Sequence, residues 1–151
     1  MDDLDRKILA ELQEEGRLSI TELAGRVGLT VSPAQRRMRD LERSGAITGY
    51  RAIVDPNALG LEFEAIVFVT MGQEDRETLL AFEEAVAAIP SVLLAQRLFG
   101  DPDYLLRVRT TDLDAYARLQ DEVFAALPGV QRLNSTLVMK SIVSDRPYPS
   151  A

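Results

Sequence analysis

The chain has 151 residues, with 17 Lys or Arg against 24 Asp or Glu, so its formal net charge is −7. It contains no Cys, His or Trp, which excludes a disulfide framework, a thiolate nucleophile, a Cys/His zinc site and the commonest general base. The hydrophobic fraction of 46% is enough for a buried core. We therefore expect a protein that is not an enzyme and has no catalytic residue, metal site or cofactor.

The start of the chain predicts a cytoplasmic protein. Residues 1–5 are acidic and lack the basic start and apolar stretch of a signal peptide. The longest apolar run, residues 65–69, is far shorter than the roughly 20 residues that span a bilayer. We expect no membrane partner.

Residues 1–50 predict a helix-turn-helix domain. Apolar residues recur at helical spacing over residues 4–12, which predicts the first helix. The second begins with the capping-box pattern Ser19-Ile20-Thr21-Glu22, and a short turn at Gly28 follows it. Such a turn between capped helices is typical of the helix-turn-helix motif.

A third helix is predicted to start at Ser32, which would be its N-cap. Pro33 would occupy the first helical position, where its missing N–H costs nothing, and Gln35 would be the reciprocal cap. The helix is expected to run to Ser44 and to stop at Gly45.

The outer face of this third helix predicts a DNA-binding surface. At about 100° per residue, Ala34, Met38 and Leu41 form a buried stripe, and the opposite arc is polar and basic. Arginine reads guanine and binds phosphate with two hydrogen bonds, and this helix holds the recognition position of the motif. The alternative is an ordinary solvated helix face; Arg37, at the border of the buried stripe, is expected to be structural or to contact phosphate. The predicted DNA-binding residues are Ser32, Gln35, Arg36, Arg37, Arg39 and Arg43.

The net negative charge of the chain does not argue against DNA binding, because the charged residues are unevenly distributed. Residues 1–60 carry nine basic and ten acidic side chains, whereas residues 61–151 carry eight and fourteen. Most of the negative charge therefore belongs to the second half of the chain.

The second half predicts a ferredoxin-like domain over residues 62–143, after a linker strand and turn over residues 51–61 and before a tail over residues 144–151. An internal repeat, in which residues 83–92 overlay residues 121–130, supports two related halves. One face of such a sheet carries no helices, and a second chain is the simplest cover for it. The fold class is thus α+β, an N-terminal helix-turn-helix domain plus a C-terminal βαββαβ domain. The predicted strands cover residues 64–71, 92–99, 103–109 and 130–142, and the predicted helices cover residues 75–89 and 113–127.

Short motifs along most of the chain share their order and spacing with one known family. They include residues 4–9, 16–19, 22–24, 27–30, 37–42, 45–50, 55–56, 59–60, 100–104 and 128–136. Through them the sequence, over about residues 3–146, resembles the Lrp/AsnC family, the leucine-responsive (feast/famine) transcription regulators of bacteria and archaea.

The resemblance implies that the N-terminal domain is of the winged-helix type. It also implies a C-terminal domain that assembles dimers, tetramers or octamers and binds an amino acid or similar small effector. Pro102 removes a backbone donor from the effector turn, and Leu133 replaces the small hydroxyl residue of many relatives, so ligand choice could shift or the response could be lost. The same turn also fits an ordinary β-turn with no ligand. The effector residues implied are Gly100, Asp101, Asp103 and Tyr104, with Ser135 contributed across an interface.

Three functions are compatible with these patterns. The first is a sequence-specific transcription regulator that binds double-stranded DNA as an oligomer and responds to an amino acid. The second is an architectural, nucleoid-type DNA-binding protein without an effector. The third, disfavoured by the missing His and Cys, is an enzyme or metabolite-binding module on a ferredoxin-like fold.

Overall fold

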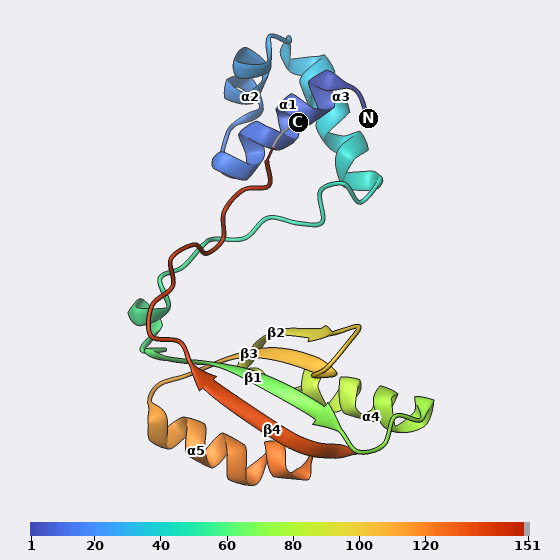
Figure 1. Ribbon diagram of the computed structural model, residues 1–151. Helices are drawn as coiled ribbons and strands as arrows, with labels where there is room; N and C mark the ends of the chain where they lie inside the picture. The colour runs from blue at the N-terminus through green and yellow to red at the C-terminus, as the bar shows by residue number, and fades with distance from the viewer. Residues whose placement is uncertain (150–151) are drawn as a thin grey trace. The chain divides into compact units, whose positions relative to one another are not determined.

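The computed structural model describes residues 1–149, which fall into two units (Figure 1). The first unit joins residues 1–53 to the tail that starts at residue 143, and the second unit spans residues 54–142. Residues 54–61 of the predicted linker therefore pack with the second unit, and the predicted tail packs with the first. Residues 150 and 151 of that tail lie outside the described residues.

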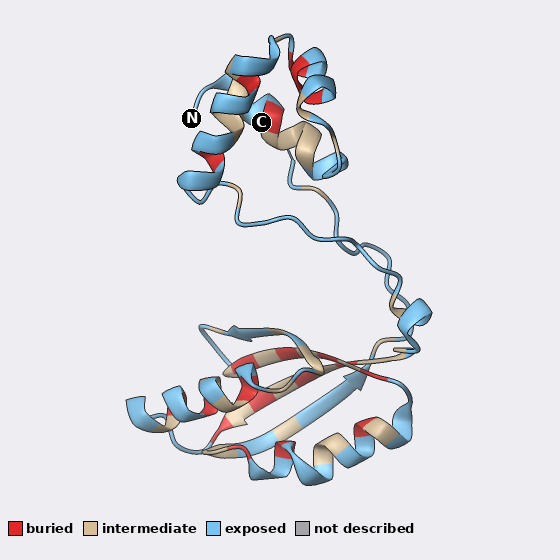
Figure 2. Ribbon diagram, turned by 180° about the vertical axis from the view of Figure 1, so that it is seen from behind, coloured by how far each residue is buried: buried red, intermediate tan, exposed pale blue. Residues whose placement is uncertain are grey.

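Within residues 1–53 the first unit contains the expected helices α1 (Asp3–Glu14), α2 (Ile20–Val27) and α3 (Val31–Arg43). Each of the three helices has buried residues, which are coloured red in Figure 2. Ile8 and Leu23 are fully buried, and the apolar residues of the three helices form one core. Burial of this apolar surface holds helices that are too short to be stable alone.

The turn between α2 and α3 follows local rules. Ser19 and Glu22 form the predicted capping box, with Ser19 N–H donating to Glu22 Oε2 at 2.9 Å. Gly28 ends α2 in the left-handed conformation, at φ 73°, and the Leu29 N–H donates to the Ala24 carbonyl at 2.8 Å. This is the glycine C-cap that turns the chain into the next helix.

The predicted start of α3 was wrong by two residues. The N-cap is Thr30 rather than Ser32, no side chain caps the helix, and Gln35 forms no reciprocal cap. Pro33 is therefore the third helical residue instead of the first. It is accommodated because the first four N–H groups of a helix lack intrahelical acceptors.

The first unit also includes the tail. The backbone N–H of Tyr148 donates to Gln13 Oε1 at 2.8 Å, and Arg51 forms an ion pair with Asp145 at 3.5 Å. The linker strand predicted within residues 51–61 is not formed: this segment contains a 3₁₀ turn, η1 (Pro56–Leu59), and no strand. A strand needs a neighbour to pair with, and sheet pairing in this chain begins at Phe63.

The second unit has the predicted βαββαβ order within residues 54–142. Its elements are β1 (Phe63–Met71), α4 (Arg76–Ala87), β2 (Val92–Arg97), β3 (Tyr104–Thr110), α5 (Leu113–Glu122), the 3₁₀ turn η2 (Phe124–Ala126) and β4 (Val130–Leu137). The strands form an antiparallel sheet in the order β2-β3-β1-β4, with both α-helices on one face (Figure 1). The ferredoxin-like prediction is confirmed. β4 ends at Leu137 rather than at residue 142, because its pairing with β1 ends at Leu137 and Ala65, followed by one hydrogen bond from the Val138 N–H to the Glu64 carbonyl at 3.0 Å.

The two faces of this sheet differ in burial. Val67 and Val69 of β1 and Leu106 of β3 are fully buried under the helices. On the opposite face Ile66 and Phe68 alternate with them and are only partly buried. The helix-free face therefore presents partly exposed apolar side chains that no element within residues 54–142 covers.

Gly129 marks the tightest turn of the second unit. It lies before β4 at φ 70°, and a Cβ there would approach Thr78 Cγ2 to 2.2 Å. Both the left-handed backbone and the close contact require glycine.

Candidate DNA-binding and effector sites

The outer face of α3 carries the predicted DNA-binding residues. Ser32, Gln35, Arg36, Arg39 and Arg43 are exposed, whereas Arg37 is partly buried. The opposite face buries Ala34 and Leu41 against the core. The helical period therefore places the stripe where the sequence predicted it, with Arg37 at its edge.

A shallow hollow of about 310 Å³ lies along this face. It is lined by Arg36, Arg39, Glu42 and Arg43. Among the described residues, Arg36 and Arg39 form no ion pair with a carboxylate, whereas Arg43 is paired with Asp40 one turn earlier. These two guanidinium groups are therefore the strongest positive feature that α3 offers to a phosphate or a guanine.

Glu42 connects this face to the segment that leaves the helix. The Tyr50 phenol donates a hydrogen bond to Glu42 Oε1 at 3.0 Å. Partial burial, followed by the Glu42 carboxylate, raises the pKa of Tyr50 above its ordinary value. No local pattern of residues predicts this contact.

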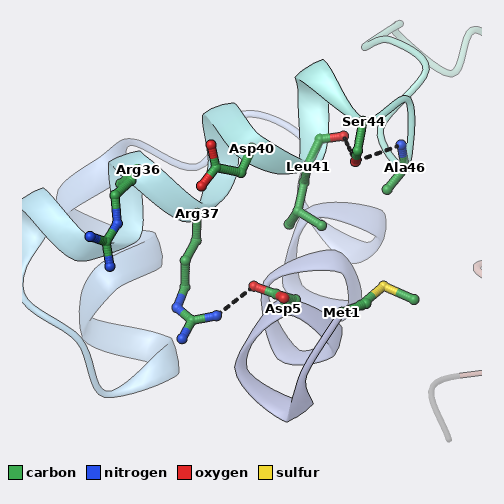
Figure 3. A pocket seen from close by; sticks show the side chains of 8 residues that line it. All are labelled: Met1, Asp5, Arg36, Arg37, Asp40, Leu41, Ser44 and Ala46. Atoms are coloured by element: carbon green, nitrogen blue, oxygen red, sulfur yellow. Dashed lines mark hydrogen bonds and ion pairs between the residues drawn. The ribbon is translucent and has the colours of Figure 1, made fainter.

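A second hollow, of about 540 Å³, lies between α1 and α3 (Figure 3). On its α3 side it is lined by Arg36, Arg37 and Asp40, and on its α1 side by Asp5. Arg37 points toward Asp5 in this view, and its Nη1 donates to Asp5 Oδ1 at 2.7 Å.

Arg37 also binds a second carboxylate. The same Nη1 donates to Asp2 Oδ2 at 2.7 Å. Asp2 and Asp5 are polar residues that sequence reasoning missed, although the segment Asp2-Asp3-Leu4-Asp5, with acids at N-cap and N3 before an apolar run, is a variant of the capping box. That pattern predicts the cap but not its contact with α3.

The predicted effector turn lies between β2 and β3. Gly100 and Asp101 are exposed, and Gly100 has a φ of 153°. Asp103 is bound within the fold: its N–H donates to the Val69 carbonyl at 2.9 Å, and its Oδ2 accepts from the Met71 N–H at 2.7 Å. The Asp103 carboxylate thus secures the turn to the end of β1.

Tyr104 points into the helix-covered core instead of into solvent. It is 2% exposed, its ring lies 4.6 Å from that of Phe82, and its phenol donates to Glu83 Oε1 at 2.8 Å. Burial, with the Glu83 carboxylate second, raises the pKa of Tyr104 to about 12.

Ser135 lies on β4, apart from the turn. Its hydroxyl is hydrogen-bonded to the Tyr116 phenol and donates to Gln120 Oε1 at 3.3 Å. Tyr104 pairs with Val69 on one side of β1, whereas Ser135 pairs with Val67 on the other side. The chain therefore brings Gly100, Asp101, Asp103 and Tyr104 together in one turn and does not bring Ser135 to them.

Within residues 1–149 no three acidic side chains gather in a way that could hold a metal ion. No helix of that described part combines the length and the apolarity needed to cross a membrane.

A helix-turn-helix domain joined to a ferredoxin-like domain defines a DNA-binding protein with a separate ligand-binding module. Family models agree: the winged helix-turn-helix DNA-binding family matches residues 1–48, and the Lrp/AsnC ligand binding domain family matches residues 64–148. The chain belongs to the Lrp/AsnC family. It is a transcription regulator with a helix-turn-helix DNA-binding domain and a ligand-binding domain, and not an enzyme.

Individual relatives match along nearly the whole chain. The leucine-responsive regulatory proteins of Escherichia coli K12 and Klebsiella pneumoniae are each 37% identical over 142 residues, which is 94% of this chain and 87% of the relative. Among solved structures, the transcriptional regulator NMB0573 of Neisseria meningitidis in complex with L-Met has a TM-score of 0.93 at 34% identity, covering 99% of this chain and 96% of that one. An AsnC family transcriptional regulator of Agrobacterium tumefaciens has the same TM-score and identity, covering 99% and 97%.

Proposed function

We propose that this regulator recognises a specific DNA sequence through the outer face of α3, with Arg36 and Arg39 at the phosphates, and acts as a homo-oligomer whose sensing domain binds an amino acid. The observation that carries the DNA part is the exposed arginine face of α3. Arg36 and Arg39 are free of ion pairs among the described residues, and Ser32 and Gln35 lie on the same exposed face near the helix start. Such a surface can contact base edges with its N-terminal residues and phosphates with its arginines. Because its proposed target is chromosomal DNA, we propose that the protein acts in the cytoplasm.

The helix-free face of the sheet supports a homodimer. Ile66, Phe68 and Leu105 are adjacent on this face and are partly exposed in the single chain. A two-fold partner would cover the same residues with its own copy of this face. Larger oligomers, tetramer or octamer, would add further DNA-binding domains and therefore avidity.

The effector is proposed to be an amino acid bound at the turn from Gly100 to Tyr104, with Ser135 supplied by another chain. The support is the relative from Neisseria meningitidis whose structure holds L-Met. In this chain Gly100, Asp101 and Ser135 are the exposed members of the set. An exposed carboxylate and backbone amides can bind the charged groups of an amino acid.

One observation favours the architectural alternative. The polar groups of Asp103, Tyr104 and Ser135 all have partners inside the fold. A protein with no effector would show these same internal hydrogen bonds. The two functions differ in whether an amino acid stabilises the folded protein.

The DNA-binding proposal is tested with a duplex containing the region upstream of the protein's own gene. Arg39→Gln is expected to weaken binding and to lower the slope of log K against log salt by about 0.9, the value for one lost phosphate contact. Arg118→Gln, at an exposed arginine of α5, is the matched control and should leave affinity and slope unchanged. Equal binding by Arg36→Ala, Arg39→Gln and the parent protein would refute the assignment of α3.

A further inference from the structure

We propose that Arg37 is a positioning residue, which fixes the recognition helix on the first turn of α1 and makes no contact with DNA. This inference rests on the proposed DNA-binding role of α3. It separates Arg37 from Arg36, Arg39 and Arg43, which lie on the same helix.

The exposure of the arginines supports this separation. The Arg37 side chain is 25% exposed, whereas that of Arg43 is 77% exposed. Arg37 lies next to the buried stripe of α3, so its side chain leaves the helix toward α1. Figure 3 shows Arg36 and Arg37 with their guanidinium groups apart and the Arg37 group at Asp5.

The hydrogen bonds show that the two carboxylates are already oriented for Arg37. Asp2 Oδ1 accepts from the Asp5 N–H at 2.9 Å, and Asp5 Oδ2 accepts from the Asp2 N–H at 3.0 Å. The remaining oxygens, Asp2 Oδ2 and Asp5 Oδ1, each accept from Arg37 Nη1 at 2.7 Å. Every oxygen of the two carboxylates therefore has a donor. The reciprocal cap of α1 orients both carboxylates through bonds that do not involve Arg37.

The local charge also opposes a phosphate contact at this position. Two carboxylates face one guanidinium, so the group of Asp2, Asp5 and Arg37 has a net charge of −1. A phosphate that approached Arg37 would be repelled by both carboxylates at short range. The pKa of Asp2 is lowered by the Asp5 backbone N–H and then by Arg37, which agrees with a tightly held ionised group.

What the contact supplies is the orientation of α3. Ala34 and Leu41 are buried apolar contacts of this helix, and such contacts have no preferred direction. A charged contact with two fixed acceptors defines one rotation of the helix, and with it the direction of Arg36 and Arg39. Arg37 therefore affects DNA binding through the orientation of Arg36 and Arg39, without contacting DNA itself.

The experiment uses the full chain and the same upstream duplex, at a temperature well below the melting point of every variant. Arg37→Gln is expected to weaken binding about two- to fivefold, which corresponds to the usual coupling energy of an exposed ion pair, with no change in the salt slope. The control Arg39→Gln, on the same helix, lowers the slope. A lower slope for Arg37→Gln would show a phosphate contact, and an unchanged affinity would show that Arg37 does not position the helix; either result overturns the proposal.

The double variant Asp2→Asn/Asp5→Asn provides an independent measurement. If Arg37 positions α3, removing its acceptors weakens DNA binding as Arg37→Gln does, and combining the changes adds no further loss. If Arg37 binds phosphate, removing two nearby negative charges strengthens binding, which would refute the proposal. Absence of DNA binding by the parent protein would instead refute the proposed function, so the two failures are distinguishable.

Discussion

Tyr104 and Glu83 join the sheet to the helix that covers it, through a hydrogen bond of 2.8 Å from the phenol to the carboxylate. Tyr104 is the first residue of β3 and Glu83 lies in the middle of α4. Asp103, the preceding residue, is bonded to the end of β1. The turn proposed to meet the effector is therefore fixed on one side by two adjacent residues, and its exposed part is limited to a few positions around Asp101.

Tyr104→Phe removes the hydrogen bond while keeping the ring against Phe82. We expect the free energy of unfolding to fall by about 1 kcal/mol, the usual net contribution of one hydrogen bond, and slightly more because Glu83 loses a donor. Urea unfolding followed by circular dichroism measures this difference. Tyr50→Phe is the control, because the hydrogen bond from Tyr50 to Glu42 lies at the surface. Its loss of unfolding free energy should be smaller than that of Tyr104→Phe. Equal losses in the two variants would show that burial does not strengthen the Tyr104 hydrogen bond.

Alkaline pH is expected to weaken the same contact. The pKa of Tyr104 is raised from 10.0 to about 12, chiefly by burial. Because the folded state holds the proton more tightly than the unfolded state, its contribution is complete below pH 10 and is lost as the pH rises toward about 12. The stability advantage of the parent protein over Tyr104→Phe should therefore shrink across this range. A difference that stays constant from pH 9 to pH 11.5 would contradict a raised pKa.

Gly129→Ala is expected to be strongly destabilising. The new Cβ would lie 2.2 Å from Thr78 Cγ2, and alanine is strained at a φ of 70°. The two effects together predict a loss of about 2 kcal/mol or more. Gly60→Ala is a matched control, because its φ is 69° but no atom lies within 4 Å of the added Cβ. If both variants lose the same stability in urea unfolding, the contact with Thr78 contributes nothing.

Ligand binding at the turn predicts a selective thermal shift. Millimolar L-methionine or another apolar amino acid is expected to raise the melting temperature of the parent protein, because a ligand of the folded state stabilises it. Asp101→Ala should reduce or abolish the shift, whereas Asp121→Ala, at an exposed carboxylate of α5, should keep it. A full shift in Asp101→Ala would remove the turn from the site, and no shift with any amino acid would favour the architectural function.

Features governed by neighbouring residues were predictable from the sequence. The Ser19–Glu22 cap, the glycine at the end of α2 and the exposed arginines of α3 depend on spacings of a few residues. The βαββαβ order followed from strand and helix periodicity. The start of α3 was misplaced because two hydroxyl residues, Thr30 and Ser32, are both plausible caps, and the chain uses Thr30, which forms no side-chain bond.

Contacts between distant residues were not predictable. Arg37 meets Asp2 and Asp5 from 35 and 32 residues away, and Tyr104 meets Glu83 from 21 residues away. No local pattern indicates which of several arginines turns inward. The periodicity placed Arg37 at a border, and the carboxylates of α1, oriented by their own cap, determine what it binds.

The return of the tail to α1 has a consequence for synthesis. The ribosome completes residues 54–142 before it makes Tyr148, whose backbone N–H binds Gln13. The sheet domain therefore has its whole sequence while the first unit still lacks its last segment. A message cut short between these points would yield a chain that contains the whole ferredoxin-like domain but lacks the contacts of the tail with Gln13 and Arg51.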